Sequence, residues 1–407
     1  MYSLAINLVR FSIIVTLLSG CSSSAKLNKQ NYDNASQKGN LISIEPIDDY
    51  SLLTLRFMFW MEGLNETIPI SNGIDLYRII YWTEDSRNEL VQASGLIAMP
   101  KSTKPLKGIV SWQHGTASLR SDAPSNLSVA HGLLPAAVFS GHGYILLAPD
   151  YIGFGVSQIN HSYYHLQSTA DSVNDLITAS KQVLQDNNIA LPESTFLTGF
   201  SQGGYASLAA TKNNEQNKLH NIVAVAPIAA AVNLVEGISD VLNSQSRFGS
   251  LYIAWIAHTY AKDYGLDLRT TIKEPWRYQL ENLFDGTHNG EEITNALPNN
   301  PGEMLTNNIL LAIENQTSHP FLDLLRENEL VDWTPTTPIC VFSGEADIDV
   351  SPKQADILLS MNPELVTSVS VGNLTHDDSV VAAAPMIRAW FDGNDYSGCP
   401  DLVKKVE

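Results

Sequence analysis

The chain has 407 residues, of which 44% are hydrophobic, enough for the core of one large domain with an insertion or of two domains. Its formal net charge of −19 argues against nucleic acid or an anionic surface as a partner, because both need positive patches. The sequence contains no basic run, zinc-ligand spacing or phosphate-binding loop. No metal or cofactor is therefore expected.

The first twenty residues indicate an export signal. Arg10 precedes an apolar run, residues 11–18, that is too short to span a bilayer. The run ends in Leu18-Ser19-Gly20-Cys21, which resembles the lipobox of bacterial lipoproteins. The resemblance implies cleavage before Cys21, lipidation of that cysteine and a membrane anchor in the bacterial cell envelope. Ser22 resembles lipoproteins sent to the outer membrane. A plain signal peptide followed by an unrelated cysteine is the alternative.

After the signal, residues 22–40 are rich in Ser, Asn, Lys, Gln and Gly and contain almost nothing apolar. Such a stretch buries too little surface to offset the entropy of ordering it, so residues 21–45 are predicted to form a flexible tether. Loss of Arg10 with the signal leaves a formal charge of −20. Cys340 and Cys399 remain as a pair for which an exported protein favours a disulfide, two free buried thiols being the alternative.

Apolar runs predict a series of strands separated by one long helix. The stretches 77–82 and 90–98 read as two strands joined by a turn. Further strands are expected at 109–112, 144–148, 196–198 and 222–225. Between residues 169 and 184 apolar positions recur with a helical period. This alternation predicts an α/β fold with a mostly parallel sheet covered by helices on both faces.

The stretch Gly199-Phe200-Ser201-Gln202-Gly203 contains Gly-x-Ser-x-Gly. In this nucleophile-elbow pattern a serine sits on a sharp turn between a strand and a helix, and the glycines allow the close backbone approach. The apolar run before it and the small residues 205–210 after it supply that strand and helix. Ser201 is therefore the predicted nucleophile. The alternative is a buried glycine-rich turn without chemistry.

Several motifs in order make the chain resemble the α/β-hydrolase superfamily, and within it the secretory-lipase group of fungal and bacterial esterases. They cover roughly residues 75–230, with a second match near the C-terminus. The main pieces are Ser94-Gly95-Leu96-Ile97-Ala98-Met99-Pro100, Gln113-His114-Gly115-Thr116, Pro149-Asp150-Tyr151-Ile152-Gly153-Phe154-Gly155 and the elbow. The resemblance implies an α/β-hydrolase fold with an inserted helical cap, acting on carboxylic esters without a cofactor.

In this fold the catalytic partners follow in the order serine, acid, histidine. After an apolar strand at 339–343, the family's Gly-x-x-Asp-x-x-Val pattern selects Asp347, with Asp349 as competitor and Glu345 as a more distant one. A solvated acidic loop is the alternative. After the alternating residues 366–371, His376 is the only histidine beyond Asp347, so it is the predicted base unless it is a surface histidine. A closing helix is expected over 380–391.

The oxyanion formed in acyl transfer needs amide donors. The amide of Gln202, which follows the nucleophile, is one predicted donor, and the family resemblance points to the amide of Thr116 as the second. His161 and His165 have the spacing of metal ligands on a helix, but no acidic third ligand lies near them in the sequence. A metal site is not predicted there.

The expected domain organisation is a signal peptide at 1–20, a tether at 21–45, a hydrolase core at 46–230 and 336–407, and a helical cap at 231–335. Two apolar helices are expected in the cap, at 251–261 and 304–314, although a helical domain with its own core is the alternative. The predicted function is a serine esterase or lipase acting on small-molecule or lipid esters. An amide or peptide hydrolase, or a silent surface-binding lipoprotein, would fit the same fold.

Overall fold

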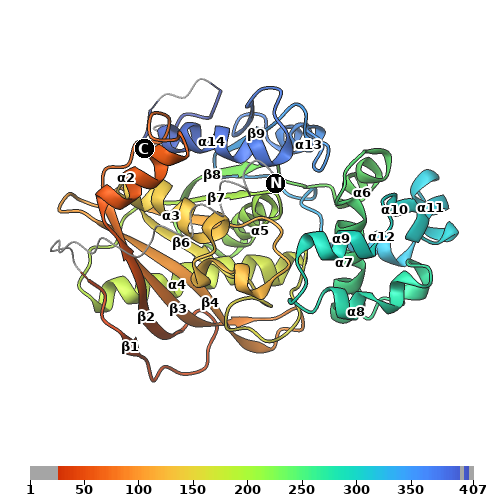
Figure 1. Ribbon diagram of the computed structural model, residues 1–407, viewed down its shortest axis with the longest axis horizontal. Coiled ribbons are helices and arrows are strands. Elements are labelled where there is room, and N and C mark those ends of the chain that lie inside the picture. Colours follow the sequence, from red (N-terminus) through yellow and green to blue (C-terminus); the bar gives the residue numbers. More distant parts are fainter. Residues whose placement is uncertain (1–25, 395–397, 403–407) are drawn as a thin grey trace.

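The computed structural model describes residues 26–394 and 398–402. Within these ranges the strands form one ten-stranded sheet in the order β1-β2-β3-β4-β6-β5-β7-β8-β9-β10 (Figure 1). The strands are β1 (Gln30–Asn31), β2 (Leu41–Tyr50), β3 (Gly73–Glu84), β4 (Leu90–Lys101), β5 (Ile109–Gln113), β6 (Ile145–Pro149), β7 (Thr195–Phe200), β8 (Ile222–Ile228), β9 (Ile339–Ser343) and β10 (Val366–Ser370).

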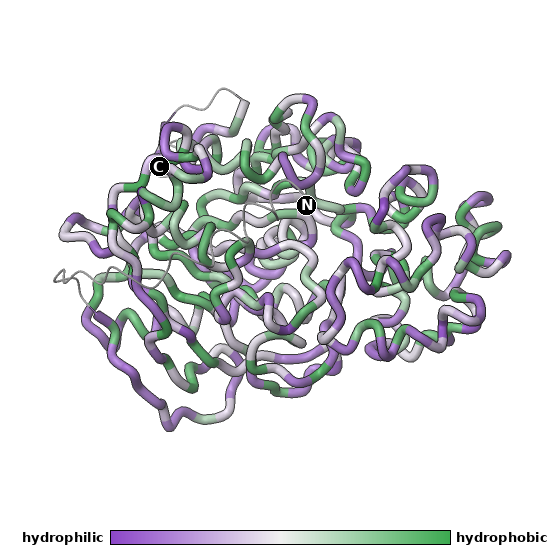
Figure 2. Tube along the Cα trace, in the orientation of Figure 1, coloured by the Kyte–Doolittle hydropathy of each residue, from purple (hydrophilic) through white to green (hydrophobic). Residues whose placement is uncertain are grey.

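Neighbouring strands in the part of the sheet that runs β6-β5-β7-β8-β9-β10 pair in parallel. Neighbouring strands in the part that runs β1-β2-β3-β4-β6 pair antiparallel. All five residues of β6 are buried, and successive ones enter opposite cores: Ile145 and Leu147 on one face, Leu146 and Ala148 on the other. Figure 2 shows the hydrophobic residues concentrated along these central strands. A strand covered on both sides needs apolar residues at every position, which is why these strands read as continuous apolar runs.

Helices cover both faces of the sheet. One face packs against α4 (Leu166–Asp186), α5 (Gln202–Asn217) and α13 (Lys353–Met361), and the other against α2 (Leu52–Met61), α3 (Leu134–Phe139) and α14 (His376–Phe391). Four short helical turns lie in the segment between β5 and β6: η1 (Arg120–Asp122), η2 (Pro124–Asn126), η3 (Val129–Leu133) and η4 (Ser140–His142). This is the α/β-hydrolase fold, as predicted.

The cap lies between β8 and β9 and forms the end of the molecule opposite β2 and α2 (Figure 1). It consists of α6 (Leu234–Asn243), α7 (Gly249–Asp263), η5 (Leu268–Thr270), η6 (Trp276–Tyr278), α8 (Leu280–Leu283), α9 (Gly290–Ala296), α10 (Pro301–Met304), α11 (Asn307–Glu314) and α12 (Pro320–Glu327). The buried residues of α6, α7 and α12 belong to the same hydrophobic cluster as those of α4 and α5. The cap therefore extends the core of the hydrolase instead of enclosing a separate one.

Two predicted helices have different bounds. The helix expected at 304–314 is interrupted, because Leu305 pairs with Ile272 in an isolated bridge and Thr306 then caps α11. The closing helix expected from residue 380 begins at His376. Its first turn is polar, so the apolar pattern marks only the part of the helix that packs on the sheet.

The tether prediction is wrong for residues 26–45. The N–H of buried Leu27 donates to the Tyr77 hydroxyl at 3.1 Å, β1 pairs with β2, and β2 pairs with β3. Backbone hydrogen bonds to a neighbouring strand hold these polar residues in place, and side-chain composition does not report such bonds. The predicted signal peptide and Cys21 lie outside the described residues.

A disulfide joins Cys340 in β9 to Cys399, with 5.2 Å between the Cα atoms. This confirms the favoured bridge and ties the C-terminal segment to the sheet. In the part of the chain that the structure describes, no helix combines the length and the apolar character needed to cross a membrane.

Candidate active site

Ser201 lies at the junction of β7 and α5, with φ 56° and ψ −116°. A positive φ is strained for a residue with a Cβ, and surrounding contacts must maintain it. The N–H of Ser201 donates to the Ile228 carbonyl in β8 at 2.8 Å. A Cβ on Gly203 would lie 1.9 Å from the Gln113 carbonyl oxygen, and one on Gly199 would lie 2.4 Å from the Gly203 oxygen. The turn therefore requires both glycines, as the motif predicted.

The loop after β5 lies against this turn. A Cβ on Gly115 would approach the Phe200 ring to 3.1 Å, and the Thr116 hydroxyl lies 2.8 Å from the Tyr163 hydroxyl. The His114 ring is buried, and burial lowers its pKa to about 4, so it is neutral at pH 7. The close contact between Gly115 and Phe200 places the neighbouring Thr116 near the turn at which helix α5 begins with Gln202.

Asp347 and His376 follow β9 and β10, so the three loops after β7, β9 and β10 meet at one edge of the sheet. His376 Nδ1 donates to Asp347 Oδ2 at 2.6 Å. The other oxygen, Oδ1, accepts the N–H groups of Asp349 and Val350, both at 2.9 Å. The His376 ring packs 4.6 Å from the Phe200 ring, centroid to centroid. The carboxylate is held at both oxygens, and the imidazole packs in a tilted arrangement against the ring of Phe200, the residue before Ser201.

The two competing acids point elsewhere. Asp349 Oδ1 accepts the hydroxyl of Ser246, between α6 and α7 of the cap, at 2.5 Å. Glu345 Oε1 accepts the hydroxyl of Ser370, at the end of β10, at 2.7 Å. Asp349 therefore links the acid loop to the cap, while Asp347 is the acid that meets the histidine.

His376 is buried, which by itself favours the neutral imidazole. The hydrogen bond and negative charge of Asp347, with further charge from Asp349 and Asp377, outweigh this effect and raise the pKa of His376 above its usual value. The imidazolium is therefore well stabilised here. A group that must accept a proton and later return it benefits from such stabilisation.

His161 has a role that the sequence reasoning missed. Its Nδ1 lies 2.7 Å from the Ile152 carbonyl oxygen, and its Nε2 lies 2.8 Å from the side-chain nitrogen of Gln202. Burial lowers the pKa of His161 to about 3, so the ring is neutral; Nδ1–H donates to Ile152, and Nε2 accepts from Gln202. The ring thus fixes the first residue of α5. The spacing of His161 and His165, considered above only for a metal site, gave no sign of this contact.

His165 instead caps α4 by accepting the Ser168 N–H at 3.2 Å. Within residues 26–394 and 398–402, no group of three or more His, Cys, Asp or Glu side chains is placed to hold a metal ion.

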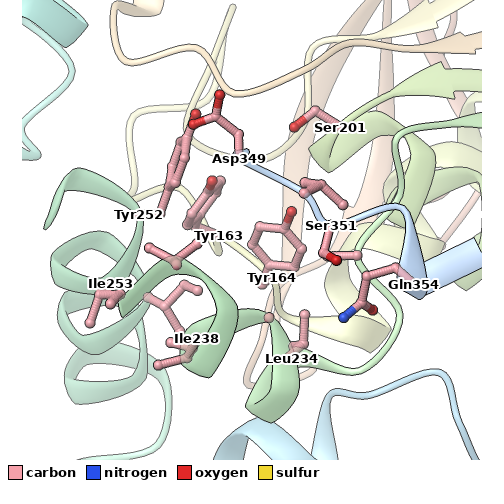
Figure 3. A pocket seen from close by; sticks show the side chains of 15 residues that line it. Tyr163, Tyr164, Ser201, Leu234, Ile238, Tyr252, Ile253, Asp349, Ser351 and Gln354 are labelled. Atoms are coloured by element: carbon pink, nitrogen blue, oxygen red, sulfur yellow. The ribbon is translucent and has the colours of Figure 1, made fainter. Parts of the chain in front are cut away.

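A mostly apolar pocket opens at Ser201 (Figure 3). Its cap wall consists of side chains from α6 and α7, including Leu234, Ile238, Val241, Tyr252, Ile253 and Ile256. Its core wall includes Tyr163, Tyr164, Asp349 and Ser351. Trp255 stacks behind Tyr163 at 4.7 Å, outside the lining. Of the aromatic residues of the cap, Tyr252 therefore lines the pocket, whereas Trp255 supports a residue of the lining from outside it.

Comparison with known proteins was consistent with this geometry. A family profile described as "Serine aminopeptidase, S33" matches residues 135–377. A search of curated proteins found no match. Similar solved structures include a putative hydrolase from Legionella pneumophila (24% identity, 86% of this chain and 96% of that chain, TM-score 0.79). Others are the rice cell wall degrading esterase LipA from Xanthomonas oryzae (22%, 88% and 97%, TM-score 0.76) and Candida antarctica lipase A in its closed state (14%, 89% and 84%, TM-score 0.66). At these identities the structural likeness shows the fold.

Proposed function

The chain belongs to the serine aminopeptidase S33 family of hydrolases, and from that premise we propose that it is a serine carboxylic-ester hydrolase acting through an acyl-enzyme. One observation carries the proposal. Ser201 sits on a strained turn at the mouth of an apolar pocket, and the residue before it, Phe200, packs its ring against His376, whose Nδ1 is hydrogen-bonded to a fixed carboxylate. This arrangement suits nucleophilic attack on an acyl carbon.

The proposed reaction has two halves. The Ser201 hydroxyl attacks the ester carbonyl carbon while His376 Nε2 accepts its proton, and the amides of Gln202 and Thr116 stabilise the oxyanion. His376 then gives the proton to the departing alcohol, and water hydrolyses the acyl-enzyme by the same steps. Asp347 orients the imidazole and stabilises its charged form.

The pocket favours substrates with an apolar acyl or alcohol part. Its lining is mainly aliphatic and aromatic, and each buried methylene stabilises binding by ~0.8 kcal/mol. The printed names of two structural neighbours, an esterase and a lipase, support ester hydrolysis for this chain as well.

An activity-based probe tests the proposal. A fluorophosphonate should label the wild-type protein at Ser201, identified by peptide mass spectrometry, and should leave Ser201→Ala unlabelled. Hydrolysis of a short-chain chromogenic ester should be lost in the same variant. Labelling at another serine would contradict the assignment, and an inert wild-type protein would favour a surface-binding role.

An amide or peptide hydrolase is the second candidate, because the matching family profile is described as a serine aminopeptidase and the same residues attack either bond. Paired assays with a p-nitrophenyl ester and aminoacyl p-nitroanilides separate the two. We expect the ester to be the faster substrate. A higher kcat/KM for an anilide would favour the peptidase.

We further propose that Cys21 carries a lipid anchor in the bacterial cell envelope, on the strength of the lipobox-like Leu18-Ser19-Gly20-Cys21. Intact-mass spectrometry should find a mature chain that begins at lipidated Cys21. Cys21→Ala should block this processing and weaken membrane association. A mature protein that retains residues before Cys21 would exclude the anchor.

A further inference from the structure

Helix α2 presents large apolar side chains to solvent. Leu53, Phe57, Trp60 and Met61 are 73%, 45%, 63% and 42% exposed, and the Phe57 and Trp60 rings stack at 6.0 Å. We call these four residues the α2 face. The opposite side of the helix, with Leu55, Met58 and Phe59, is buried against the sheet.

A helix that is apolar all round is normally buried all round. The α2 face holds four of the twelve exposed large hydrophobic side chains among the described residues, although the helix has ten residues. The others are spread over the remaining chain, and single exposed apolar residues need no explanation. A cluster of this kind marks a surface that binds something apolar.

The proposed lipid anchor on Cys21 indicates that the α2 face contacts a lipid bilayer. Leu27 is hydrogen-bonded to Tyr77, four residues along β3 from Gly73, and Gly73 packs against the first residues of α2. Four residues of strand span about 13 Å. Cys21 precedes Leu27 by six residues, which reach about 20 Å when extended. A lipid on Cys21 therefore has enough chain to enter a bilayer at the level of α2.

The charge of the helix is compatible with such a surface. In a chain with a net charge of −19, α2 carries no carboxylate, and its one charged residue is Arg56. The Arg56 Nε donates to the Ile70 carbonyl at 2.9 Å. Tryptophan beside aliphatic residues is also the composition that favours the boundary between headgroups and acyl chains.

We propose that the α2 face docks into the interfacial region of the bilayer that holds the Cys21 anchor. The anchor keeps the protein at the membrane, and the α2 face orients it. Because α2 and the cap lie at opposite ends of the molecule (Figure 1), this docking turns the cap toward the aqueous side. Ester substrates then reach the pocket from solution.

Flotation with vesicles of the zwitterionic lipids phosphatidylethanolamine and phosphatidylcholine tests the α2 face without the anchor and without repulsion from an anionic surface. The protein is the exported chain, residues 21–407, with Cys21→Ser. The test variant adds Leu53→Gln, Phe57→Gln and Trp60→Gln; the matched control adds Leu191→Gln, Leu219→Gln and Leu311→Gln, three exposed leucines elsewhere. We expect the vesicle-bound to free ratio to fall at least about tenfold in the test variant and little in the control. Unchanged thermal midpoints show that both variants are folded.

A second measurement is needed in case the unlipidated chain binds vesicles too weakly to float with them. In the lipidated protein on vesicles of brominated lipid, tryptophan fluorescence should be quenched, and Trp60→Phe should remove most of that quenching. Equal flotation of the test and control variants overturns the proposal. So does the absence of flotation together with quenching that does not depend on Trp60. The inference rests on the proposed Cys21 anchor, but neither measurement uses the esterase reaction and the flotation test needs no lipidated protein, so a failure of the esterase or anchor proposal can be told apart from a failure of this one.

Discussion

Different interactions hold the two sides of the pocket in place. On the core side of the site, short directional contacts fix Ser201, through its hydrogen bond to Ile228 and the glycines beside it, and Asp347, through two backbone N–H groups. The cap wall consists mainly of aliphatic side chains of α6 and α7 that touch through apolar surface. Chemistry demands fixed atoms, whereas apolar binding demands only shape and area. Changes in the two walls should therefore have effects of different size and kind.

The largest effect is expected for Ser201→Ala. Because the side chain carries bond formation and little packing, kcat should fall by about four to six orders of magnitude for every ester, while the thermal midpoint stays close to that of the wild type. Rate measurements on acetyl and octanoyl esters, with thermal unfolding of the same samples, check this. A loss of activity on esters of only one acyl chain length would mean that Ser201 contributes to substrate binding and not to the chemical step.

The next effect separates the two aspartates. Asp347→Asn should lower kcat by about 10⁴, because the amide favours the wrong histidine tautomer. Asp349→Asn should retain most of the activity, since the Asp349 carboxylate bonds to Ser246 of the cap. The substitutions change few atoms and lie two residues apart, so each controls for the other. The reverse ranking would identify Asp349 as the orienting acid.

Changes in the cap should depend on substrate. If Ile238 and Ile253 contact the acyl chain in the transition state, Ile238→Ala or Ile253→Ala should lower kcat/KM for octanoyl esters by roughly tenfold and spare acetyl esters. Leu311→Ala, at an exposed cap position, is the matched control. Equal losses on both esters would mean that the cap supports the fold and does not bind the acyl chain.

Trp255 needs a different expectation. It stacks on Tyr163, whose hydroxyl contacts Thr116, so Trp255→Ala should lower both rates through the proposed oxyanion loop.

The smallest effect concerns pH. The base must be neutral, so kcat/KM should rise with pH through the pKa of His376, which nearby carboxylates raise. Asp377→Asn removes one of those charges, disfavours the imidazolium and should move this limb of the profile to lower pH. Asp378→Asn is the control, because that side chain accepts the Thr375 hydroxyl and is not one of the carboxylates that raise the pKa of His376 as described above. A shift to higher pH would contradict the electrostatic account.

Local sequence patterns foresaw much of the fold and the positions of the candidate chemistry. Alternation and apolar runs located the central strands because a doubly covered sheet leaves a continuous apolar trace. The glycines at 199 and 203 located the turn at Ser201 because nothing larger fits there. The resemblance to the family selected Asp347, and the chain order serine, acid, histidine selected His376; in the structure Nδ1 of His376 and Oδ2 of Asp347 lie 2.6 Å apart.

The sequence by itself therefore determined the strands of the α/β-hydrolase sheet, because doubly covered strands leave apolar runs, and the strained turn, because of strict steric limits. It indicated the acid–histidine pair through the resemblance to the family and the chain order of the catalytic residues. Only the tertiary structure decided that residues 26–45 complete the sheet, that His161 fixes Gln202, that Asp349 bonds to the cap, and that α6 and α7 form the apolar wall. These contacts join residues far apart in the chain. A hydrogen bond of that kind needs one polar atom on each side, and it leaves no period or spacing in the sequence.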